Sequence, residues 1–131
     1  MSNPSEVDFV EAGRVAARVA KEAYRQHRCS FIGVEHGVVG PNQRLSINHA
    51  MLVGAFLATC HFPASKLHLV NPQDTKMAMC PKGKKRDKKE MVATAGHRVR
   101  GFPTGETQVI QEAVADACGV ARAAYLLAGY G

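Results

Sequence analysis

Apolar residues recur at helical spacing near the N-terminus, and basic residues occupy the positions between them. The stretch Asn3-Pro4-Ser5-Glu6 has the pattern of a helix N-cap, and we expect this helix to end near His27. Its apolar positions are Val7, Val10, Val15, Val19 and Ala23, and its basic positions are Arg14, Arg18, Lys21 and Arg25.

The middle of the chain alternates between short apolar runs and a longer segment rich in small residues. Residues 30–35 and 67–70 are short apolar runs, which predict two buried strands. Residues 46–59 combine Ala, Leu, Met and Gly, and we expect them to form a helix packed closely on a sheet.

The last third begins with a basic stretch, residues 76–89, whose Pro81 and Gly83 predict a loop. Asp87 and Glu90 form a capping box that opens a short helix to Ala95. A loop over 97–105 and a long alanine-rich helix over 107–127 follow. The predicted order is α-β-α-β-α-α, an α/β fold in one domain over residues 1–131.

Composition narrows the class of partner. The chain has 131 residues, 17 Lys+Arg against 11 Asp+Glu, and a net charge of +6, which favours a polyanionic partner such as nucleic acid. No apolar run is long enough to span a membrane. The four cysteines lack CxxC spacing and no signal peptide precedes them, so we expect reduced thiols in a cytoplasmic protein.

Three acidic side chains are candidates for metal binding. Glu35 ends the first predicted strand, at the sheet edge where α/β proteins usually bind ligands. Glu112 and Asp116 lie four apart on the last helix and therefore share one face, among small apolar residues. Carboxylates suit Mg²⁺, with Mn²⁺ as a substitute, and two such ions promote phosphodiester hydrolysis.

Five segments in this order resemble RuvC-type Holliday-junction resolvases, which belong to the RNase H-like superfamily. Residues 31–35 resemble the central strand with the second catalytic acid, and residues 46–55 the helix after it. Residues 70–76 resemble a strand exit that leads into a lysine, and residues 81–92 the family's Gly-to-Lys stretch. Residues 115–121 look like the terminal helix with the last metal ligand.

The resemblance implies a partial RNase H-like fold, with a central sheet flanked by helices, in a homodimer that cleaves branched DNA. It assigns Glu35 and Asp116 as metal ligands, and Lys76 and Lys88 as catalytic lysines near the cleaved phosphate. The family has a further acid at the position of Ala113, and the neighbouring Glu112 is the candidate to replace it. The basic stretch supplies the expected DNA contacts: Lys82, Lys84, Lys85, Arg86 and Lys89.

The chain departs from the family at its front. The family begins with a strand-turn-strand unit that carries a leading Asp, whereas this sequence opens directly with a helix, so the domain is N-terminally incomplete by comparison. Two alternatives to an active nuclease therefore stay open. One is a catalytically degenerate relative that binds junction DNA, and the other is a small α/β protein-interaction domain. In each case we expect the protein in the cytoplasm of a bacterial or phage-infected cell.

Overall fold

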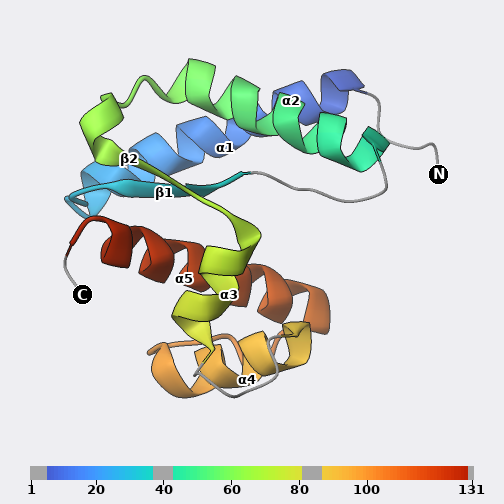
Figure 1. The fold of residues 1–131 in the computed structure, drawn as a ribbon, viewed down its shortest axis with the longest axis vertical. Coiled ribbons are helices and arrows are strands. Elements are labelled where there is room, and N and C mark those ends of the chain that lie inside the picture. The colour runs from blue at the N-terminus through green and yellow to red at the C-terminus, as the bar shows by residue number, and fades with distance from the viewer. Residues whose placement is uncertain (1–5, 37–42, 81–86, 130–131) are drawn as a thin grey trace.

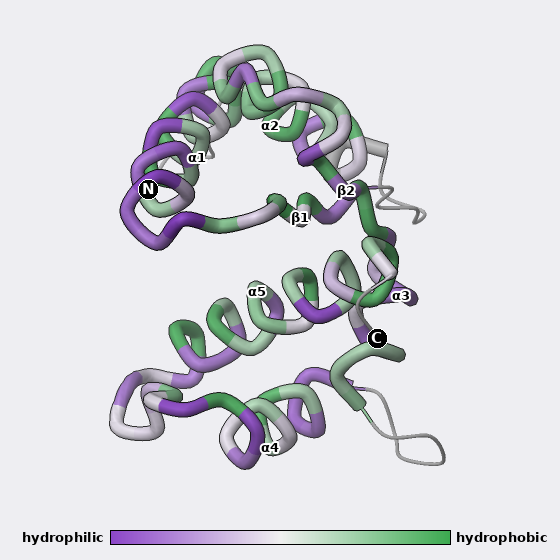
Figure 2. The backbone as a smooth tube through the Cα atoms, turned by 90° about the vertical axis from the view of Figure 1, so that its left-hand side faces the viewer, coloured by the Kyte–Doolittle hydropathy of each residue, from purple (hydrophilic) through white to green (hydrophobic). Residues whose placement is uncertain are grey.

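A computed structural model describes residues 6–36, 43–80 and 87–129. Along the chain it contains helix α1 (Glu6–Gln26), strand β1 (Ile32–Glu35), helix α2 (Gln43–Cys60), a 3₁₀ turn (Ala64–Lys66) and strand β2 (Leu67–Val70). Helices α3 (Pro72–Met79), α4 (Lys88–Arg98) and α5 (Gln108–Leu127) follow. The two strands lie between the α1–α2 pair and α5, and α4 lies beyond α5 (Figures 1 and 2).

Helices α1 and α2 run side by side in the same direction (Figure 1). Gly13 of α1 lies against the Leu52 carbonyl and the Phe56 amide of α2, so this contact has no room for a side chain on residue 13. Ala17, Phe56 and Cys60 form the buried cluster between the two helices. Small residues therefore let the two helix backbones approach closely.

The strands β1 and β2 pair in parallel through the crossover helix α2, with Ile32 opposite Leu67 and Glu35 opposite Val70. Ile32 and Val34 pack on the α1–α2 cluster. Gly33 points the other way, because successive strand residues alternate between faces, and a Cβ there would lie 2.8 Å from the Ala124 Cβ of α5. The sheet thus connects the α1–α2 pair to α5.

A second core joins α3, α4 and α5. Each helix begins with a side-chain cap that accepts a backbone N–H: Asn71 from Asp74, Asp87 from Glu90, and Thr107 from Ile110. The capping box predicted at Asp87 and Glu90 is confirmed in its Asp87 half. The buried residues of this core are Met79, Cys80, Met91, Ala95, Phe102 and Ala115.

The predicted fold class is wrong. The described residues are mostly helical and contain a sheet of only two four-residue strands, so they do not form the central sheet of an RNase H-like fold. The physical reason is that most of the buried surface lies between helices, in the α1–α2 and α3–α4–α5 cores. The sequence also predicts a loop from residue 76, whereas residues 72–79 form α3, which Asn71 and Pro72 initiate.

Among the described residues, no helix is both long enough and apolar enough to cross a membrane.

Candidate functional site

Glu35 lies at the carboxyl end of β1, where its half-buried side chain faces helix α3. The Thr75 hydroxyl donates a hydrogen bond of 3.0 Å to Glu35 Oε2. Thr75 is 3% exposed, and its hydroxyl also lies 3.3 Å from the carbonyl oxygen of Asn71, one helical turn earlier. Helix α3 therefore holds the Glu35 carboxylate through Oε2, and Oε1 takes no part in this hydrogen bond.

Helix α5 reaches the same part of α3. A Cβ on Gly119 would lie 2.7 Å from Thr75 Cγ2 and 3.3 Å from the Thr75 carbonyl oxygen, so the two helices are in backbone-close contact there. Asp116 lies three positions before Gly119 and thus on a neighbouring part of the helix surface. Glu35 and Asp116 therefore approach the Thr75–Lys76 stretch from different elements.

The electrostatic surroundings of Asp116 bring several predicted residues together. Burial raises the pKa of its carboxyl group above the ordinary value of 3.8, because the surrounding protein removes water from the charged form. Lys88 and Lys76 act in the opposite direction and lower this pKa, while the negative charge of Glu112 raises it. Two lysines and a second carboxylate thus lie within electrostatic range of Asp116.

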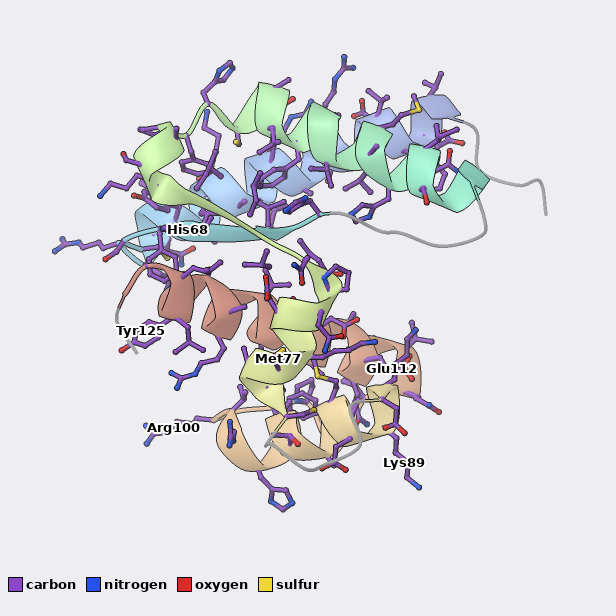
Figure 3. The ribbon with its side chains drawn as sticks, viewed as in Figure 1. His68, Met77, Lys89, Arg100, Glu112 and Tyr125 are labelled. Carbon is purple, nitrogen blue, oxygen red and sulfur yellow. The ribbon has the colours of Figure 1, made fainter. Side chains whose placement is uncertain are left out.

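The lysines and Glu112 that the sequence predicts for the site come from helices α3, α4 and α5. Lys76 is exposed on α3, Lys88 is exposed in the first turn of α4, and Lys89 follows it at the surface. Glu112 lies on α5 and accepts a 3.1 Å hydrogen bond from Gln108 Nε2 (Figure 3). The remaining DNA-binding candidates, Lys82, Lys84, Lys85 and Arg86, lie outside the described residues.

The described residues offer few ligands for a divalent cation. Across residues 6–36, 43–80 and 87–129, no group of three or more His, Cys, Asp or Glu side chains is arranged to hold a metal ion. Mg²⁺, however, is commonly bound through one or two carboxylates, with waters and substrate phosphates completing its shell. A site of this sparse kind would use Glu35, which Thr75 holds, and Asp116, whose pKa Lys76 and Lys88 lower.

Two residues of this site are not among the predicted ones. Thr75 lies between two charged residues in a stretch interpreted as strand exit and loop, and only the Asn71-Pro72 helix start signals that its side chain turns inward. His49 belongs to no motif in the sequence that marks it as functional, but its Nε2 lies 3.3 Å from the carbonyl oxygen of Glu35. No spacing rule links His49 to a strand 14 positions earlier.

No protein-family model, curated protein or solved structure matches this chain.

Proposed function

We propose that the protein is a divalent-cation-dependent endodeoxyribonuclease that acts on branched DNA such as four-way junctions. One feature carries the proposal: the Asp116 carboxyl, whose pKa burial raises, lies within electrostatic range of both Lys76 and Lys88. Carboxylates bind the hard cation, and lysines neutralise a phosphate, so this combination suits phosphodiester hydrolysis.

The roles of the individual residues follow from their contacts. Asp116 and Glu35 would hold Mg²⁺, or Mn²⁺ in its place, and the bound ion supplies water activation and stabilisation of the leaving oxygen. Thr75 orients Glu35 through its 3.0 Å hydrogen bond. Glu112 adds negative charge beside Asp116, which raises the pKa of Asp116 in the absence of a cation and favours cation binding.

The lysines hold the substrate. Lys76 and Lys88 come from different helices and lie near the same carboxylate, so both would contact a phosphate bound beside it. The net charge of +6 adds a long-range attraction for DNA. In the hydrolysis, the oxygen of water forms the new bond to phosphorus, the P–O bond of the backbone breaks, and the leaving oxygen takes up a proton.

A specific observation favours a second candidate function, which is junction binding without cleavage. The described residues offer two carboxylates near α3 and no cluster of three metal-binding side chains. A protein of this kind keeps its lysine contacts to phosphate and lacks the charge needed to hold two cations.

A nicking assay on a labelled four-way junction tests the proposal. We expect Mg²⁺-dependent nicking that Glu35→Gln and Asp116→Asn each reduce by at least about 100-fold. The matched control Glu22→Gln, an exposed carboxylate on α1, should leave nicking unchanged. Binding that weakens steeply with salt, with no nicking at any Mg²⁺ concentration, supports the second candidate instead. If the junction DNA does not bind at ~100 mM salt, both DNA proposals are wrong and a protein-interaction role is favoured.

A further inference from the structure

The edge of β1 that faces away from β2 opens onto a hollow between α2 and α5. The hollow has a volume of about 340 Å³, and three consecutive strand residues, Gly33, Val34 and Glu35, line it. Consecutive strand residues face opposite sides of a sheet, so a hollow that touches all three lies along the strand's edge. Its walls are His49, Leu52, Val53 and Phe56 of α2 and Ala117, Val120 and Ala121 of α5.

The backbone at this edge has hydrogen-bonding groups directed into the hollow. His36 N–H donates to the Val70 carbonyl at 2.8 Å, so the peptide groups of His36, Val34 and Ile32 face β2. Those of Gly33 and Glu35 consequently face the opposite edge, where the His49 ring lies 3.3 Å from the Glu35 carbonyl oxygen. Within the described parts of the chain, no hydrogen-bond partner meets the Gly33 amide or carbonyl.

We propose that this edge binds an extended, uncharged strand of a second polypeptide, which adds to the sheet beside β1. The strand would pair with the Gly33 backbone, as extended peptides do at open sheet edges. Its alternate side chains would lie against the apolar wall of α2 and the small residues of α5. Glu35, at one end, is the single carboxylate of the lining, so charge complementarity favours an uncharged occupant along the remaining length.

The position of the edge distinguishes this occupant from a second copy of the same chain. Paired strands lie about 4.8 Å apart. A second copy carries α2 and α5 on both sides of its own β1, and these walls would meet the walls of the first copy before the strands reached that spacing. A single strand without flanking helices carries no such walls.

Titration of the isotopically labelled chain with a short, capped peptide of alternating valine and threonine tests this inference. We expect saturable NMR shifts at the Gly33 and Glu35 amides with a Kd below about 1 mM, and slower hydrogen exchange at Gly33. A peptide N-methylated at every valine and every threonine provides the matched control. Its methyl groups block pairing on both edges, so it should not bind.

Protein variants test the location. Ala121→Arg places a long side chain in the hollow and should weaken peptide binding at least tenfold. Ala93→Arg, an equally exposed position on α4 outside the hollow, should leave it unchanged. The inference is overturned by absence of saturable shifts, by equal binding of the methylated and unmethylated peptides, or by equal effects of the two variants. Protection of Gly33 that rises with protein concentration in peptide-free samples would assign the edge to a second copy and overturn it as well.

Discussion

The hydroxyl of Thr75 donates a 3.0 Å hydrogen bond to the carboxylate of Glu35, which lies 40 positions earlier in the sequence. The same Thr75 packs its methyl group on Gly119 of α5. One buried residue of α3 therefore links the end of β1 to the helix that carries Asp116. The geometry of the candidate site depends on this link, because Glu35 and Asp116 belong to elements that meet around Thr75.

Removal of the Thr75 hydroxyl should destabilise the protein. Thr75→Val keeps the shape of the side chain and deletes the donor to Glu35, so we expect the free energy of unfolding to fall by about 1 kcal/mol or somewhat more. Urea unfolding measures the change. Thr94→Val is the matched control, because the hydroxyl of this buried threonine makes a longer 3.5 Å contact with Glu90 Oε1 and its loss should cost less. Equal losses in the two variants would contradict a special role for the Thr75–Glu35 bond.

The raised pKa of Asp116 predicts a pH-dependent effect of Asp116→Asn. The folded protein binds the proton of this carboxyl more tightly than the unfolded chain does. Between pH 3.8 and the higher folded pKa, the Asp116 contribution to stability therefore falls as pH rises, whereas asparagine does not titrate. The stability of the variant relative to wild type should accordingly increase across that window and stay constant above it.

Unfolding by urea at a series of pH values, without divalent cations, measures this difference. Lys88→Met provides a companion test, because Lys88 lowers the pKa of Asp116 and its removal should move the upper end of the window to higher pH. A stability difference between Asp116→Asn and wild type that decreases as pH rises would contradict the assigned direction of the shift.

The pattern of apolar residues predicted most of the helices and both strands, but it assigned the wrong buried face to α1. The valines recur at helical spacing, yet Val7, Val15 and Val19 are 74%, 46% and 64% exposed. The buried positions are Gly13 and Ala17, because close approach to α2 requires small side chains. Hydrophobicity alone does not reveal which small residues permit such an approach.

Only part of the candidate site was predictable from the sequence, because local patterns do not specify how helices pack. Strand-end and helix-face rules single out Glu35 and Asp116 from sequence. The contact between Thr75 and Gly119 depends on how α3 crosses α5, and no local pattern specifies that crossing. The fold class was wrong because two short apolar runs, each correctly identified, were extended to a larger sheet by resemblance, while the chain buries its apolar surface mainly between helices.

A methyl group at Gly119 should disrupt the contact between α3 and α5. Its Cβ would lie 2.7 Å from Thr75 Cγ2 and 3.1 Å from Met91 Cε, so Gly119→Ala should destabilise the protein by about 1–3 kcal/mol despite alanine's better helix propensity. Gly54→Ala is the matched control on α2, where nothing lies within 4 Å of the new Cβ. That variant should gain about 0.5–1 kcal/mol. Thermal or urea unfolding compares them, and a stable Gly119→Ala would show that the helices are not in close contact.

The lysines beside Asp116 should determine how strongly DNA binding depends on salt. Each phosphate contact releases a counterion, so Lys76→Ala and Lys88→Ala should each weaken junction binding and reduce the slope of log K against log salt by about 1. Lys21→Ala removes an exposed lysine from α1, on the other side of the sheet, and should leave the slope unchanged. Fluorescence anisotropy over a range of salt concentrations, with Ca²⁺ in place of Mg²⁺, gives the slopes. If all three variants lower the slope equally, general charge rather than the Asp116 site holds the DNA.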